Sequence, residues 1–254
     1  MLSIGFDFTL GQAAIILVAY LFAATTKGLT GLGFSTTCLP ILVFSLGLKD
    51  ALPLVIIPSI CSNLIVQRQV GHFKESILRF WPMLIATLPG LGLGLWVLAW
   101  IDGGLAGGIF GVVLLLWCGF SFAKPELRLP ARFERPLAPI SGFLTGMVNG
   151  ATGSQVMPIV PFMMSLHLGR DLFIQGINCS FTMSSLVMAF GLGHLGLFSW
   201  VDIFISTLGI CMVFLGLRLG SAIRHRLSEK VFRQAILTML SLMGMTLLLP
   251  VLNF

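Results

Sequence analysis

Two glycine-rich stretches carry the residue types that bind small anions without a formal charge. The first covers residues 28–37 and the second covers residues 146–155. A glycine-rich break in a membrane helix exposes backbone N–H groups where the next helix starts, and these groups together with the helix dipole favour negative charge. Glycine also lets a ligand approach the backbone closely. Both stretches contain short polar side chains, so we predict that they bind a small oxyanion.

The expected contacts of this oxyanion are backbone amides, over residues 33–35 and 152–154, and neighbouring polar side chains. Two facing helix starts could then hold one oxyanion near the middle of the membrane. The alternative is that the glycines only let helices pack closely, as small residues do in membranes. The candidate substrate-binding residues of the two stretches are Gly31, Gly33, Ser35, Thr36, Asn149, Gly150, Thr152, Gly153, Ser154 and Gln155.

Lys27 is the cation that directly precedes the first glycine-rich stretch. An ionisable side chain inside a membrane is costly and indicates a functional site. We therefore expect Lys27 to attract the anion or to balance its charge. The alternative is that its long side chain reaches to the membrane surface from a helix end.

Polar residues on two further apolar segments extend the candidate site. Ser62 and Asn63 lie in the segment 51–67, and Asn178 and Ser180 lie in the segment 172–193. Buried polar groups in a bundle usually only bond neighbouring helices; the alternative is that these four residues line the site.

No spacing among the four histidines makes a metal site. The cysteines Cys38, Cys61 and Cys179 are expected to be small buried hydrophobic residues, the alternative being a thiol that passes sulfur to or from a substrate. We predict no metal, no cofactor and no catalytic residue.

The composition determines the kind of protein that must position these residues. Of the 254 residues, 57% are hydrophobic and 9% are charged, whereas about 25% are charged in a typical soluble domain. This excludes a soluble enzyme, a nucleic-acid-binding protein and a disordered chain. Because the alternating pattern of barrel strands is absent, the sequence predicts an all-α polytopic membrane protein with about 8–10 membrane segments.

Charge-free runs outline these segments, since a spanning helix needs about 20 apolar residues. Single spans are predicted at 51–67, 80–101, 103–123, 172–193, 200–219 and 234–254. The run 136–169 is too long for one span. With a break at residues 149–154, each side has about 14 residues and measures roughly 21 Å, so the glycine-rich regions are expected to interrupt helices or to form re-entrant hairpins.

The positions of the basic residues predict the orientation of the protein in the membrane. Loops 68–79, 124–135 and 218–233 hold most Lys and Arg residues and are placed inside. The two glycine-rich regions would then enter the membrane from opposite sides.

The sequence also contains a weak internal repeat. When the sequence is compared with itself after a shift of 118 residues, Gly28 aligns with Gly146 and Cys61 aligns with Cys179. We therefore predict two inverted membrane repeats, 1–127 and 128–254, within one transmembrane domain, a pattern typical of secondary transporters.

The glycine-rich motifs resemble those of the TauE/SafE family. Residues 27–34, KGLTGLGF, followed by Pro40, are similar to its first signature, and residues 142–146, GFLTG, with 149–153, NGATG, and Pro158 are similar to its second. The resemblance implies a carrier of sulfite, sulfonates or other small organosulfur anions across the cytoplasmic membrane, usually as an exporter. Its partners would be a small anionic solute and the lipid bilayer, and no nucleic acid.

Several functions remain open at this point. No nucleotide-binding motif is present, so either the membrane potential or proton coupling could drive transport. The alternative functions are an importer, a carrier of a different small anion, an intramembrane enzyme that uses Ser154 and His194, and a purely structural subunit. The oligomeric state is left open.

Overall fold

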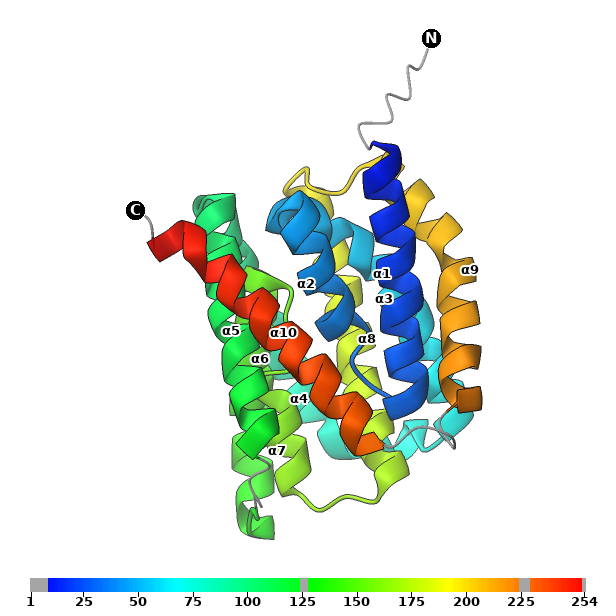
Figure 1. Cartoon of the computed structure of the whole chain (residues 1–254). Coiled ribbons are helices and arrows are strands. Elements are labelled where there is room, and N and C mark those ends of the chain that lie inside the picture. The colour runs from blue at the N-terminus through cyan, green and yellow to red at the C-terminus, as the bar shows by residue number, and fades with distance from the viewer. Residues whose placement is uncertain (1–8, 124–127, 224–228, 253–254) are drawn as a thin grey trace.

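The computed structural model describes residues 9–123, 128–223 and 229–252, and these residues are almost entirely helical, with no strand (Figure 1). Because lipid offers no hydrogen-bond partners, a spanning chain must pair its backbone groups internally. The helices in the described residues are α1 (Leu10–Thr30), α2 (Phe34–Leu46), α3 (Leu48–Val70), α4 (Phe73–Trp100), α5 (Gly103–Ala123), the short 3-10 helix η1 (Ala131–Phe133), α6 (Glu134–Thr152), α7 (Ile159–Ser165), α8 (Arg170–His194), α9 (Trp200–Ile223) and α10 (Glu229–Leu252).

Six of these helices, α1, α3, α4, α5, α8 and α9, are long and apolar enough to cross a membrane. This confirms the predicted all-α, multi-pass membrane protein. Most of the predicted spans lie inside longer helices, because the helices continue past the last apolar residue into the charged loops. The last two residues of the predicted 234–254 span lie outside the described part of the chain.

Two pairs of helices pack with their backbones in direct contact. On the α4–α6 interface, a side chain at Gly90, Gly94, Gly142, Gly146 or Gly150 would collide with the backbone of the opposite helix. On the α1–α9 interface, a Cβ atom at Gly28 would lie 2.5 Å from the carbonyl oxygen of Leu217. The helices α3 and α8 pack against each other, α3 also packs against α9, and α8 also packs against α4. The helices α5 and α10 form a further pair beside them (Figure 1).

The glycine-rich regions do interrupt helices, but the arms on either side of the second break are not equal. Helix α6 has 19 residues and α7 has 7, so the prediction of about 14 residues on each side was wrong. The glycines of α6 serve the contact with α4 and leave the helix intact. The chain leaves helical geometry only at Gly153, where φ is 75°. The first break lies at residues 31–33, where Gly31 and Gly33 have φ values of 83° and 92°.

The basic segments gather at one end of the bundle, which we call the basic end. The α3–α4 connection, η1 and the α7–α8 connection lie there, and the α2–α3, α4–α5 and α8–α9 connections lie at the opposite end (Figure 1). An ion pair of 2.7 Å joins Arg79 to Glu134 at the basic end, and Lys49 Nζ donates to the Ile101 carbonyl over 2.8 Å at the other. The predicted orientation puts the basic end inside. Lys124, Arg224 and Arg226 of the basic loops lie outside the described residues.

Candidate functional site

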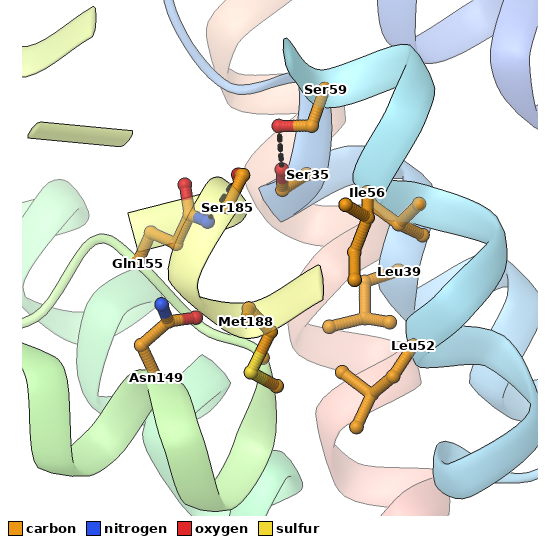
Figure 2. Close-up of a pocket in the computed structure, with 11 residues that line it drawn as sticks. Ser35, Leu39, Leu52, Ile56, Ser59, Asn149, Gln155, Ser185 and Met188 are labelled. Carbon is orange, nitrogen blue, oxygen red and sulfur yellow. Dashed lines mark hydrogen bonds between the residues drawn. The ribbon is translucent and has the colours of Figure 1, made fainter. Parts of the chain in front are cut away.

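A cavity that we call the small cavity lies where the first turn of α2 and the last turn of α6 meet the central helices α3 and α8 (Figure 2). Its volume is about 20 Å³, and polar and apolar side chains share its wall. The lining residues are Ser35, Leu39, Leu52, Val55, Ile56, Ser59, Asn149, Gly153, Gln155, Ser185 and Met188. The structure therefore brings together four predicted site residues, Ser35, Asn149, Gly153 and Gln155, from both glycine-rich stretches.

The polar groups of this cavity are only partly satisfied. The hydroxyls of Ser35 and Ser59 are 2.8 Å apart, and Gln155 Nε2 donates to Ser185 Oγ over 3.0 Å. The carboxamide of Asn149 is 1% exposed, and neither its nitrogen nor its oxygen has a hydrogen-bond partner. Buried polar groups are nearly always bonded, so this carboxamide is free to form hydrogen bonds with a molecule that enters the cavity.

The local chain geometry explains how Asn149 and Gly153 reach the cavity. The N–H of Gly153 closes the last turn of α6 by donating to the Asn149 carbonyl over 2.7 Å. A Cβ atom at Gly153 would lie 2.8 Å from Leu39 Cδ2 and closer still to Leu52 Cδ2. Glycine is therefore required here both for its positive φ and for the space between two leucines of the wall.

Replacing Gly153 by alanine is expected to lower transport more than the same change at Gly33. Both glycines have positive φ, where an L-residue costs about 1–2 kcal/mol. Space is open around Gly33, however, whereas a methyl group at Gly153 pushes Leu39 and Leu52 into the cavity. The measurement is solute flux per folded protein for both variants. Equal flux would show that the space at Gly153 is irrelevant.

Only one of the two predicted helix starts faces this region. Helix α2 begins after Gly33 without a side-chain cap, so the amides of residues 34–36 keep their free N–H groups. At the second break the cavity meets the end of α6, and the predicted free amides there are already used. Gly153 N–H bonds Asn149, and Ser154 N–H donates to Thr152 Oγ over 3.2 Å. The prediction of two facing helix starts was therefore wrong, because the cavity meets the C-terminal end of α6, whereas the next helix, α7, begins only at Ile159.

A second, larger cavity of about 530 Å³ lies on the other side of the α2 start, a volume within the range of ligand pockets. Gly33 and Thr36, two further predicted site residues, line it at one end, and it extends to His167 and Arg170 near the basic end. Its remaining wall is mostly apolar and includes Trp117, Val160, Met163, Phe173, Phe181, Leu237 and Leu240. The first turn of α2 therefore separates the small cavity from the larger cavity, which reaches toward the basic end.

Lys27 is buried between helices and does not reach the surface of the molecule. Its side chain is 1% exposed, and Nζ donates to Ser62 Oγ over 3.3 Å and to Asn63 Oδ1. Ser62 in turn donates to the Ser59 carbonyl over 2.9 Å. The predicted site residues Lys27, Ser62 and Asn63 thus form one cluster, which we call the Lys27 cluster. Ser59 links it to the small cavity.

The other predicted residues lie outside both cavities. Asn178 Nδ2 donates to the carbonyls of Ile174 and Gly31, over 2.8 and 3.3 Å, and so fastens α8 to the end of α1. Gly150 packs against the backbone of α4, and Thr152 Oγ donates to the Val148 carbonyl over 2.7 Å. Ser180 is buried with its hydroxyl unbonded, and Ser154 is buried beside the α6 end.

Two polar residues of the cavity, Ser59 and Ser185, were not among the predicted site residues. Their helical spacing offers a signal, because Ser59 lies one turn before Ser62 on α3, and Ser185 lies two turns after Asn178 on α8. The pair proposed for an intramembrane enzyme is not brought together in the described residues. His194 is exposed at the end of α8 and contacts the ring of Phe190, and no contact joins it to Ser154. Those residues also contain no group of three or more metal-ligating side chains.

Comparison with known proteins assigns the chain to a family. The family model of the sulfite exporter TauE/SafE matches residues 16–247, which is nearly the whole chain. No curated protein and no solved structure matches it. The family is one of membrane transporters for sulfite and organosulfur anions, so membership implies a transporter and not an enzyme. The glycine-rich breaks, the helical membrane bundle and this match together place the chain in the sulfite exporter TauE/SafE family.

Proposed function

We propose that this protein is a secondary transporter that exports a small sulfur oxyanion, such as sulfite or a sulfonate, across the cytoplasmic membrane. The observation that carries this proposal is the unbonded, buried carboxamide of Asn149 in the small cavity between the two glycine-rich breaks. Asn149 can donate two N–H bonds to an oxyanion, and the hydroxyls of Ser35 and Ser59 can turn to donate as well. The free amides at the start of α2 add positive potential nearby.

The cavity volumes support a carrier that must change shape. About 20 Å³ is room for roughly one water molecule, so an oxyanion enters only when the surrounding helices move. The larger cavity on the basic side of the α2 start offers a route from the inside to this point. We infer that the anion loads through the larger cavity from the cytoplasm, which favours export over import.

We further propose that the halves 1–127 and 128–254 are inverted repeats. The helix contacts support this, because exchanging the first five α-helices with the last five turns the α1–α9 pair into the α6–α4 pair, and the α3–α9 pair into the α8–α4 pair. The α3–α8 and α5–α10 pairs map onto themselves. An odd number of helices in each half gives the halves opposite orientations in the membrane.

Flux into proteoliposomes that contain only this protein tests the proposal. The panel is sulfite, sulfate, thiosulfate, taurine, sulfoacetate and acetate, each under a membrane potential and under a pH gradient. We expect flux of at least one sulfur oxyanion, and loss of that flux in Gly153→Leu, because the larger side chain fills the cavity. If no sulfur anion moves under either gradient, the proposed substrate class is wrong. Flux of acetate alone would indicate a carrier of a different anion.

A further inference from the structure

Lys27 presents a buried amino group whose hydrogen bonds reach only neutral oxygen atoms. Its partners are the hydroxyl of Ser62 and the carboxamide oxygen of Asn63. The ion pairs in the described residues join His72 to Glu75 and Arg79 to Glu134, so none involves Lys27. A charged ammonium group inside a membrane bundle is costly unless an opposite charge accompanies it.

Counting hydrogen-bond donors shows what the Lys27 cluster lacks. A neutral amine has two N–H groups, and the protein supplies two acceptors for them, on Ser62 and Asn63. The ammonium form has three donors, so its third N–H has no acceptor among the described hydrogen bonds. Asn63 is 1% exposed, and its Nδ2 also has no partner. The cluster therefore lacks acceptors and negative charge, and an anion oxygen would supply both.

The Lys27 cluster is connected to the small cavity by hydrogen bonds. Ser62 accepts from Lys27 and donates to the Ser59 carbonyl over 2.9 Å. The Ser59 hydroxyl lies 2.8 Å from that of Ser35 in the cavity wall. An anion that passes through this part of the bundle therefore comes close to both the cavity and Lys27.

The helices packed around Lys27 contribute other titratable groups, and no described hydrogen bond joins any of them to it. Cys179 donates to Gln67 over 3.3 Å, and Asp202 accepts from the Ser199 N–H over 2.8 Å at the start of α9. Arg218 on α9 is exposed. The full set on α2, α3, α8 and α9 is Cys38, Lys49, Asp50, Cys61, Arg68, Arg170, Asp171, Cys179, His194, Asp202, Cys211 and Arg218.

We propose that Lys27 couples the binding of the anion to the binding of a proton. The amine is neutral in the empty protein. When an anion docks beside Lys27 and Asn63, the nitrogen lone pair binds one proton (H⁺) taken up from the solution on the loading side, and the ammonium group is paired with the anion. The proton leaves again when the anion leaves, and no covalent bond to the anion forms.

This inference rests on the proposed anion transport but not on its direction. Two ligands that stabilise each other's binding show reciprocal coupling. Acid on the loading side is therefore expected to raise anion affinity, with a limit of about tenfold per pH unit for one linked proton. A monovalent anion and its proton would cross together without net charge.

The test uses proteoliposomes with methanesulfonate and sulfate as probes, because these anions of strong acids do not titrate near neutral pH. Anion counterflow, flux at acidic, neutral and alkaline pH, and the internal pH reported by a trapped dye are measured together. The variants are Lys27→Met and Asn63→Asp. The matched control is Lys49→Met, a half-buried lysine that bonds the Ile101 carbonyl at the opposite end of the bundle.

We expect wild type and Lys49→Met to move protons with the anion and to show flux that rises severalfold in acid. Lys27→Met should keep at most about a tenth of the flux, without pH dependence and without proton movement. Asn63→Asp keeps an oxygen acceptor for Lys27 and adds the missing negative charge inside the protein. This variant should therefore fold normally and lose flux, even if Lys27→Met does not fold.

The possible contrary results separate this inference from the proposed function. If the anion flux of Lys27→Met depended on pH as it does in wild type, or if Asn63→Asp kept the wild-type flux, the coupling role of Lys27 would be overturned. If the wild-type protein exchanges a probe but moves no proton and ignores pH, the coupling is wrong and the transport stands. If it exchanges neither probe, the coupling is wrong, and the proposed function fails with it only if sulfite and the other sulfur anions of the first panel do not move either.

Discussion

Replacing Asn149 by leucine is expected to lower anion flux by about 10- to 100-fold while leaving the protein folded. The carboxamide is buried and unbonded in the wall of the small cavity. A hydrogen bond to a charged group contributes about 1.5–3 kcal/mol, and 1.4 kcal/mol corresponds to about a factor of ten. Leucine has a similar size but cannot donate to the anion. Because an unbonded buried carboxamide is itself unfavourable, the melting temperature in detergent should stay constant or rise.

The combination of lower flux and unchanged stability distinguishes a binding residue from a structural one. Ser141→Ala is the matched control, because Ser141 lies two turns earlier on the same helix and its buried hydroxyl is also unbonded. Ser141 does not line the small cavity, so the flux of the Ser141→Ala variant should match that of wild type. Wild-type flux in Asn149→Leu would remove this residue from the proposed site.

Replacing Gly146 by valine is expected to prevent stable folding. A Cβ atom at Gly146 would collide with the carbonyl oxygen of Thr87 and lie 2.8 Å from the amide nitrogen of Leu91. These atoms belong to the backbone of α4, so the two helices must separate. Overpacking typically costs about 1–3 kcal/mol, and the cost here should lie at or above that range, because close helix contact replaces the hydrophobic effect as the source of stability in membranes.

Gly92→Val is the control for this prediction. Gly92 lies on the same helix, α4, is exposed, and has open space around its Cβ position. The measurement is the yield and melting temperature of purified protein by size-exclusion chromatography in detergent. The Gly146 variant should aggregate, and the Gly92 variant should behave as wild type. Equal behaviour of both would mean that α4 and α6 tolerate separation.

The difference between these two kinds of glycine illustrates a limit of sequence interpretation. The sequence predicts that the glycines of residues 142–153 either break a helix or allow packing, and it cannot assign each residue to one role. In the structure, Gly150 packs against α4, whereas Gly153, three residues later, adopts a positive φ and ends the helix. The assignment depends on a partner helix more than 50 residues away in the chain.

The candidate site was also only partly predictable. Ser35, Asn149, Gly153 and Gln155 were predicted because a glycine-rich break exposes backbone N–H groups next to short polar side chains. The missed residues Ser59 and Ser185 lie in ordinary helical positions, and only the contact of α3 and α8 brings them to the cavity. Asn178, which was predicted to line the site, instead donates to the Gly31 carbonyl at the end of α1.

The sequence by itself determined the helical membrane class, the positions of the spans, the family and the two interruptions. These properties are local, because apolar length and glycine content act within one segment of the chain. The tertiary structure alone decided that α6 ends at the cavity where a helix start was predicted, that Lys27 bonds Ser62 and Asn63, and that the Asn149 carboxamide has no partner. Each of these depends on which neighbours fill the space around a side chain, and that is set by helix packing between distant segments.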